Sequence, residues 1–458
     1  MKKLLLNTSK TNQQNLFYSQ LSDMLDMNDP LIALANAIDW EIFENEFAGF
    51  YSKDGCPAKP IRLMVGLLIL KQLENLSDES IVIQWKRNPY YQYFCGYNEM
   101  QLCEPCHSTQ LVKFRQRIGK EGMELIFKVS VQLHGNKAEE KEVLIDTTVQ
   151  EKNITYPTDG KLAIKMIHHL HKIGKKEQLN LRRTFVKEIK EHRINLRFFK
   201  HPKKIKKARS SIKRLRTIVG ILIRDISRNL KQDKLSNYTN TFDLFDKVRN
   251  QQIKDSNKVL SLHESHVYAI TKGKDHKKYE YGTKASIVAT KDSGVIVGVA
   301  SHSKNEHDSK TLEAALISAN KTRTTAIKEV ICDRGYRGIK EVLGTIISIP
   351  GTTLKKDTEY QKQQKRDKFK RRAAIEPIIG HLKSDFRLAR NYLKGFIGDQ
   401  INLLLAATAW NLKKWMNIYF FAIISGEMKL LLESIKQIKL YNQIFLQLIV
   451  IKLIFTHP

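Results

Sequence analysis

The sequence predicts a mixed α/β protein, because two short apolar runs each lead into an aspartate and a helical segment carries a glutamate. Asp146 follows Val143-Leu144-Ile145, and Asp333 follows Val330-Ile331-Cys332. An apolar run without polar alternation is typical of a strand buried on both faces of an α/β sheet. Glu376 lies on a segment with helical spacing. The apolar positions of that segment are Ile375, Ile379, Leu382 and Phe386.

The three carboxylates together predict a site for a divalent cation. Aspartates that follow buried strands lie at the strand ends, where open α/β sheets place their sites. Mg²⁺ is bound by few carboxylates and keeps its waters for substrate phosphates. The alternative, that Asp146, Asp333 and Glu376 are ordinary surface acids, holds for most single acidic residues. The residues that flank these three favour the cation site.

Residues 17 to about 135 have helical patterns, and we expect a helical N-terminal domain with the bounds 1–138. Ser77 is placed to cap a helix whose first turn holds Asp78 and Glu79, where acids complement the helix dipole. An earlier helix is expected after Pro60. Its apolar positions are Leu63, Leu67, Leu70 and Leu73.

A third helix is expected to start with Ser108 as its cap, and it carries cations. Lys113, Arg115 and Arg117 project from it beside an apolar stripe. Side chains on a short helix can reach base edges and phosphates in a DNA groove. Arg115 and Arg117 are therefore candidate DNA contacts. The alternatives are a solvated basic face, and a domain that serves assembly.

The order of elements after Lys141 indicates one particular fold. The predicted strands are 143–149, 279–289, 295–301, the run before Asp333, and 346–349. A helix that begins at Asp308 separates the third strand from the fourth, and the Glu376 helix comes last. Acid-bearing strand, hairpin, helix, acid-bearing strand and acid-bearing helix is the order of an RNase H-like fold. We expect this catalytic domain at 139–395, with a basic helical insertion at about 161–260 and an apolar helical C-terminal tail at 396–458.

The basic insertion is the second candidate for a DNA-binding surface. Residues 172–216 hold 18 Lys and Arg against three Glu. Few aromatic residues accompany them, which favours contacts with phosphates over base stacking. The candidate contacts are Lys203, Lys204, Lys206 and Lys207. The alternative is a merely solvated helix.

The overall charge favours a polyanionic partner. The chain of 458 residues has 78 Lys and Arg against 47 Asp and Glu, a formal net charge of +31. Such a surface binds nucleic acid by releasing counterions from the phosphate backbone; an anionic membrane surface is the alternative. The start, MKKLLLNTSK, is too short in apolar residues for a signal sequence, and no uncharged run approaches the length of a membrane span. We therefore expect a cytoplasmic, nucleoid-associated protein without a membrane partner.

The five cysteines do not predict a disulfide framework, since their number is odd. Cys103-Glu104-Pro105-Cys106-His107 matches the haem attachment pattern and half of a zinc site. No second half follows, and we interpret these cysteines as structural or incidental.

Several blocks resemble bacterial insertion-sequence transposases of the DDE type, in the insertion-sequence-five family. The blocks are 76–96, 105–109, 145–151, 156–159, 263–284, 305–312 and 332–338. The most specific is the Tyr-Arg-Glu-Lys signature of that family, which here reads Phe369, Arg372, Glu376 and Lys383. Only the tyrosine differs, and its replacement removes a hydroxyl but no carboxylate. The resemblance runs from about residue 15 to about residue 415.

The resemblance implies a transposase that cuts DNA at insertion-sequence ends and joins the ends to target DNA. Asp146, Asp333 and Glu376 would be the catalytic residues and the ligands of two Mg²⁺ or Mn²⁺ ions. Arg372 and Lys383 would position phosphates of double-stranded DNA. Such an enzyme would act as a homodimer or a higher oligomer. Two alternatives remain open: a metal-dependent DNA nuclease, and a non-catalytic DNA-binding protein derived from a transposase.

Overall fold

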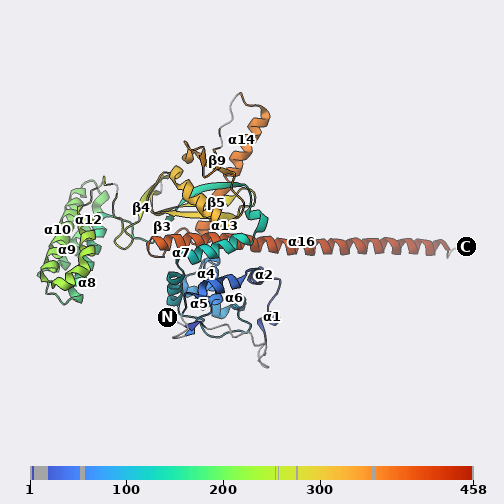
Figure 1. The fold of residues 1–458 in the computed structure, drawn as a ribbon, viewed down its shortest axis with the longest axis horizontal. Coiled ribbons are helices and arrows are strands. Elements are labelled where there is room, and N and C mark those ends of the chain that lie inside the picture. The colour runs from blue at the N-terminus through green and yellow to red at the C-terminus, as the bar shows by residue number, and fades with distance from the viewer. Residues whose placement is uncertain are drawn as a thin grey trace.

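The computed structural model consists of a sheet with covering helices, a helical unit that stands apart, and one long helix that projects beyond the rest (Figure 1). It describes residues 3–4, 19–51, 57–252, 254–255, 257–274, 277–349, 351 and 356–455, with side chains described except at 3–4, 272–274, 277 and 427–455.

The N-terminal region is helical, as the sequence predicts. Its longest helices are α4 and α7, and a two-residue pairing of β1 with β2 accompanies them. The helices are α1 (Leu21–Met24), α2 (Pro30–Ala37), α3 (Trp40–Ala48), α4 (Ile61–Leu73), α5 (Asp78–Arg87), α6 (Pro89–Phe94) and α7 (Ser108–Gln132); the strands are β1 (Lys3–Leu4) and β2 (Pro57–Ala58). Ser77 caps α5 by accepting from the Ser80 amide, which confirms that assignment. The cap of α7 is His107, so the expectation of Ser108 as its cap is wrong by one residue.

The described residues form a mixed sheet of seven strands. Its path is β6-β5-β3-β7-β9-β8, with β4 beside the other half of β5. β3 is antiparallel to β5 and parallel to β7, and β7 is parallel to β9. The strands are β3 (Glu142–Glu151), β4 (Tyr268–Lys274), β5 (Lys277–Thr290), β6 (Ile296–His302), β7 (Glu329–Ile331), β8 (Glu341–Val342) and β9 (Thr345–Ser348). This mixed α/β arrangement is consistent with an RNase H-like core.

Alternate residues of β3 face two different hydrophobic clusters. Val143 and Ile145 belong to the main core, whereas Leu144 belongs to a small cluster with Ile331 and Ile375. Successive side chains of a strand point to opposite faces of the sheet. The prediction of a strand buried on both faces is therefore confirmed.

The main core is continuous from the N-terminal helices to the sheet. The first part of α16 (Gly395–Phe455) lies between them, with Ile401 to Met416 contributing buried residues. The buried Asn411 amide joins the layers, since it accepts from the Ile296 amide at 2.9 Å and donates to the Ile296 carbonyl at 2.8 Å. The range 396–458 is thus not a single tail, because its first third is a core helix.

Helices α13 (Leu312–Thr322), α14 (Glu359–Arg372) and α15 (Ile375–Ser384) complete the region around the sheet. α13 packs on β5 and β6, and α15 packs on β3. α14 has no buried residue and extends away from the sheet.

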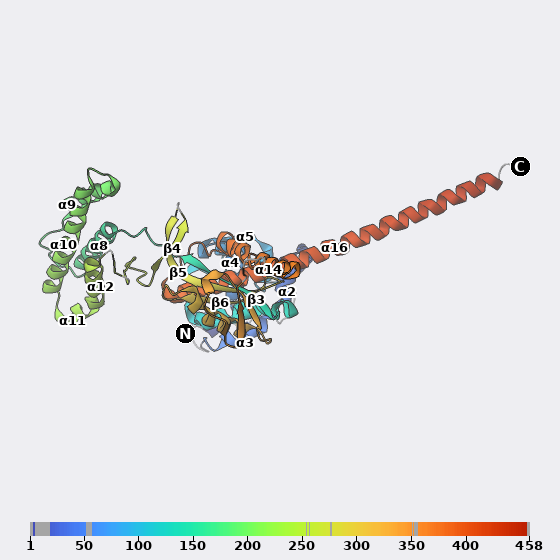
Figure 2. The ribbon, with the colours of Figure 1, turned by 90° about the horizontal axis from the view of Figure 1, so that it is seen from above.

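The segment between β3 and β4 is a helical unit with its own hydrophobic cluster. It consists of α8 (Asp159–Lys176), α9 (Val186–Asn195), α10 (Ile205–Asn229), α11 (Gln232–Leu235) and α12 (Thr239–Asn250). Both views show this unit at a distance from the sheet (Figure 1, Figure 2). A buried polar group lies at its junction with the sheet: Lys152 Nζ is 2.5 Å from Asp399 Oδ1 and 3.5 Å from Glu264. Because Asp399 belongs to α16, the junction is tied to the core.

None of the helices in the described part of the chain combines the length and the apolar character that crossing a bilayer requires.

Candidate active site

The register between β3 and β7 brings Asp146 and Asp333 side by side. The two parallel strands pair up to Leu144 and Ile331, and each aspartate lies two residues further along its strand direction. Residues i and i+2 of a strand share a face, so both aspartates follow onto the face that carries Leu144 and Ile331. Asp146 lies within β3 and not beyond its end, because β3 continues to Glu151 in its pairing with β5. The parallel pairing of β3 with β7, by contrast, ends before Asp146.

The small cluster under α15 brings Glu376 to the same edge of the sheet. Ile375 packs with Leu144 and Ile331, and Glu376 is the next residue after Ile375. One apolar contact therefore positions all three predicted acids, since each is one or two residues from a member of the cluster.

The surroundings of Asp146 favour the protonated form of its carboxyl group. Burial, together with the nearby carboxylates of Asp333 and Asp308, raises the pKa of Asp146 to about 6. The Thr147 amide, which donates to Asp146 Oδ1 at 2.7 Å, and the charge of Arg372 act in the opposite direction. Carboxylates that crowd one another in a buried place are the kind of oxygen ligands that a hard divalent cation binds.

Asp308 is a fourth acid of this region, and its sequence surroundings predict only the start of a helix. It accepts from Thr147 Oγ1 at 2.9 Å and from Lys284 Nζ at 2.9 Å. A Cβ at Gly335 would lie 3.1 Å from Asp308 Oδ2 and 3.0 Å from Asp333 Oδ1, so the two carboxylates flank that glycine. The signal available in the sequence was its place in the block 305–312.

The Glu376 carboxylate points to Arg372 and not to the aspartates. Arg372 Nη2 lies 3.0 Å from Glu376 Oε1, and the Glu376 side chain is 60% exposed. No three His, Cys, Asp or Glu side chains among the described residues are gathered so that they could hold a metal ion. The backbone thus fits a three-carboxylate site, while the Glu376 rotamer does not complete it.

Arg372, Glu376 and Lys383 do not share one straight helix. Arg372 ends α14 and α15 begins at Ile375, which agrees with the break that Pro377 imposes on a regular helix. Lys383 lies seven residues after Glu376 on α15, about two turns along the same face.

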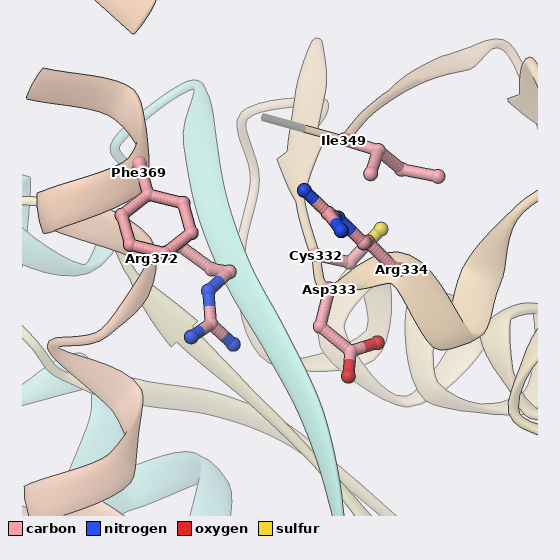
Figure 3. Close-up of a pocket in the computed structure, with 6 residues that line it drawn as sticks. All are labelled: Cys332, Asp333, Arg334, Ile349, Phe369 and Arg372. Atoms are coloured by element: carbon pink, nitrogen blue, oxygen red, sulfur yellow. The ribbon is translucent and has the colours of Figure 1, made fainter. Parts of the chain in front are cut away.

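A cavity of about 220 Å³ separates Arg372 from Asp333. Figure 3 shows the two side chains extending from opposite sides, with Phe369 beside Arg372. The Arg372 guanidinium lies 5.6 Å from the centre of the Phe369 ring, which is itself 54% exposed. The cavity is open to a phosphate chain that could contact the arginine and approach the aspartate.

The other predicted DNA contacts differ in exposure. Lys203, Lys204, Lys206 and Lys207 are all exposed around the start of α10. Arg117 is half-buried and stacks on Tyr51, with its guanidinium 4.8 Å from the ring centre.

Arg115 is not on a basic face, and its assignment as a DNA contact is wrong. The residue is only 4% exposed, and its guanidinium donates two hydrogen bonds to Asp78. Lys71 lies 2.9 Å from the same carboxylate. The buried face of α7 is wide enough to include Arg115. The Arg115 side chain therefore lies between the N-terminal helices, where it binds Asp78 of α5.

The described cysteines are free thiols: Cys95, Cys106 and Cys332 are buried and Cys103 is exposed. Cys56 lies outside the described residues.

Comparisons with known proteins match two parts of the chain. Residues 19–117 match the family model described as "Transposase domain (DUF772)", and residues 255–412 match the one described as "Transposase DDE domain". The second range includes Asp333 and Glu376, whereas Asp146 lies between the two ranges. The chain is also 37% identical over 194 residues to "Uncharacterized protein ORF8 in nfe locus" of Rhizobium meliloti, covering 94% of that protein and 41% of this chain. No solved structure matches the chain.

Proposed function

Because the chain belongs to the DDE transposases of insertion sequences, we propose that it cuts DNA at the ends of its element and joins the freed 3′-hydroxyls to target DNA. The assignment to the insertion-sequence-five family is part of this proposal. It is supported by Phe369, Arg372, Glu376 and Lys383, which keep the spacing of the family signature.

The observation that carries the proposal is the small cluster of Leu144, Ile331 and Ile375. It gathers two strands and a helix that are far apart in the sequence, and each brings one carboxylate to the same edge. A purely structural role does not account for Asp146, because burial of an uncompensated carboxylate costs free energy.

The residues present fit divalent cations, which Asp146, Asp333 and Glu376 would hold. Two bound Mg²⁺ or Mn²⁺ ions supply activation of the attacking oxygen and stabilisation of the leaving 3′-oxygen. Arg372 and Lys383 would contact phosphates on either side of the scissile bond. Since Arg372 holds Glu376 here, a phosphate that takes over Arg372 frees Glu376 to turn toward the aspartates. DNA binding and completion of the site would therefore be coupled.

The test is a cleavage and joining assay on duplexes made from the DNA that flanks the gene. We expect cleavage with Mg²⁺ or Mn²⁺ and none in a chelator, because carboxylate oxygens bind these hard cations. We expect little cleavage with Ca²⁺, because this larger ion takes more oxygen ligands at longer distances. Joining of a pre-cut end to a second duplex identifies a transposase. Cleavage without joining would indicate a nuclease, and binding without either reaction would indicate a non-catalytic DNA-binding protein.

We propose that the N-terminal helices of the 1–138 region read the element ends and that the enzyme acts as a dimer or higher oligomer. The support is the concave surface between α4 and α7, where Lys113 and Arg117 lie side by side with Lys59. The range 139–395, with its helical insertion, would hold the DNA for cleavage. Because the main core runs through both ranges, point substitutions in the full-length chain test this division better than truncation near Lys141.

Replacing Lys113 and Arg117 together by Gln is expected to reduce the preference for end duplex over scrambled duplex by about tenfold or more, since a good side-chain contact to a base contributes roughly 1–3 kcal/mol. The measurement is the pair of dissociation constants at fixed salt. Lys128→Gln, at an exposed position of the same helix, is the control. An unchanged preference in the double variant would assign end recognition elsewhere and leave these helices to assembly.

A further inference from the structure

We infer that the outer face of α10 binds the phosphate backbone of duplex DNA. This face, called the track below, is about as long as one turn of the DNA double helix. This inference rests on the proposed function for its ligand. It moves the centre of the predicted basic surface from the lysines around residue 204 to arginines further along α10.

Five of the eight Lys and Arg residues of α10 lie on a single face of the helix. At about 100° per residue, Lys206, Arg209, Lys213, Arg224 and Arg228 fall within an arc of about 100°. The buried residues of α10 lie on the opposite side. They are Ala208, Ser211, Leu215, Ile218, Val219, Gly220, Leu222, Ile223 and Ile226, of which Gly220 alone lies toward the basic face.

Two concave surfaces lie along this face. One, of about 470 Å³, is lined by Arg209, Lys213, Arg216 and Arg249. The other, of about 320 Å³, is lined by Arg224 and Arg228 together with Arg182 and Arg183 from the loop before α9. The loop and α12 thus add cations to those of α10.

Gly220 connects the two surfaces. A Cβ at this position would overlap the guanidinium of Arg249, which comes from α12 and lies across α10 next to Arg224. Arg249 is oriented by Asp246 at 2.9 Å, and Arg216 by Asp159 at 2.8 Å. The row of cations is therefore continuous past the middle of the helix.

Four cations of the track form no ion pair with any described residue. They are Arg209, Lys213, Arg224 and Arg228, and all four side chains are exposed. By contrast, Arg214 on the flank of α10 is neutralised by Glu188 at 2.5 Å. Unpaired arginines in a row repel one another, so a row of anions is the ligand that relieves the repulsion.

The dimensions suit duplex DNA. From Lys206 to Arg228 the helix rises about 33 Å, close to the 34–36 Å of roughly one turn of B-DNA. Stacking with unpaired bases is not supported, because this face has no exposed aromatic residue. A bilayer surface is not supported either, because such helices insert apolar side chains, and α10 has no exposed large apolar residue.

The test compares two triple variants of the full-length protein, each of which removes three positive charges. Arg209, Arg224 and Arg228 are replaced by Gln in one. Lys161, Lys247 and Lys254, which are exposed on other parts of the same helical unit, are replaced by Gln in the other. The probe is a 40-base-pair duplex of arbitrary sequence, chosen as a length of about four turns, and the measurement is its affinity as a function of salt.

We expect the α10 variant to flatten the slope of log K against log salt by about 2.7, because each of the three neutralised phosphates contributes about −0.9. The control should change it by less than one. Replacement of the same three arginines by Lys should restore the slope, which separates loss of charge from misfolding. An unchanged slope, equal effects of both triple variants, or stronger binding to vesicles of anionic lipid than to duplex would each overturn the inference.

The outcome is distinguishable from failure of the proposed function. A wild-type protein that binds duplex through this face but cannot cut DNA would refute the transposase activity and leave the track intact. A wild-type protein that cuts and joins DNA while the α10 variant binds normally would refute the track alone.

Discussion

Replacing Asp146, Asp333 or Glu376 by the corresponding amide is expected to abolish DNA cleavage while duplex affinity stays within about twofold of the wild type. Each amide keeps the shape of the side chain but removes a negative ligand of the ions, which contribute several kcal/mol of transition-state stabilisation. A loss of that size lowers the rate roughly a thousandfold or more. Affinity depends on the basic surfaces and should persist. The measurement is single-turnover cleavage of a pre-bound end duplex.

Glu313→Gln is the matched control, because Glu313 is an exposed acid on the neighbouring helix α13. It should cleave at the wild-type rate. Near wild-type cleavage by any one of the three site variants would remove that residue from the catalytic set.

The Asp146→Asn variant should also differ from the wild type in how its stability depends on pH, when a chelator keeps metal ions out of the site. The pKa of Asp146 is raised to about 6 by burial and by its acidic neighbours, so the folded wild type binds a proton more tightly than the unfolded chain. Wild-type stability therefore falls as pH rises from about 4 to about 6, whereas the amide lacks this dependence. In urea unfolding, the free energy of unfolding of the variant should exceed that of the wild type by about 3 kcal/mol above pH 6. Below pH 4 the two proteins should be equally stable. Equal stability at pH 8 would contradict the burial of this carboxylate.

Replacing Asp78 by Ala is expected to destabilise the protein by about 3–5 kcal/mol, the usual cost of leaving buried charges without a partner. Asp78 accepts from Arg115 and lies 2.9 Å from Lys71, and both cations are less than a tenth exposed. Burial alone would raise the pKa of Asp78, but the two cations outweigh it and lower the pKa to about 2. This stability is present above the ordinary aspartate pKa near 4 and is lost as pH falls toward 2.

Glu79→Ala is the control, since Glu79 occupies the same first turn of α5 but is exposed. Its loss should cost about 1 kcal/mol or less. Urea unfolding at pH 7 compares the two variants. If Asp78→Ala cost no more than Glu79→Ala, the three charges would be solvated and Arg115 would again be available for DNA.

The sequence was informative where the signal is local. Short apolar runs predicted β3 and β7, and the spacing around Glu376 predicted α15, because strand and helix formation depend on nearby residues. The carboxylates could be selected for the same reason, since each adjoins the apolar residues that bury its element. Pro377 is a local cause of the break between Arg372 and Ile375, because its ring clashes with the carbonyl four residues earlier in a regular helix.

What the tertiary structure decided is how distant residues are paired. The β3–β7 register sets Asp146 beside Asp333, and the packing of Ile375 on Leu144 brings α15 to them. In both contacts the two partners are far apart in the sequence. The burial of Arg115 depends on Asp78, which local pattern does not reveal, because a cation on an amphipathic helix looks the same whether solvent or a buried carboxylate faces it.

For the basic helical unit, too, the sequence and the tertiary structure decide different properties. The sequence determined by itself that residues 172–216 are strongly basic and helical, since charge and periodicity are local properties. Only the tertiary structure decided which cations of this segment, and of the part of α10 that follows it, stay free. Glu188 neutralises Arg214 and Asp159 engages Arg216, whereas Arg209, Arg224 and Arg228 remain on one outer face because the opposite face of α10 is buried against α8 and α12.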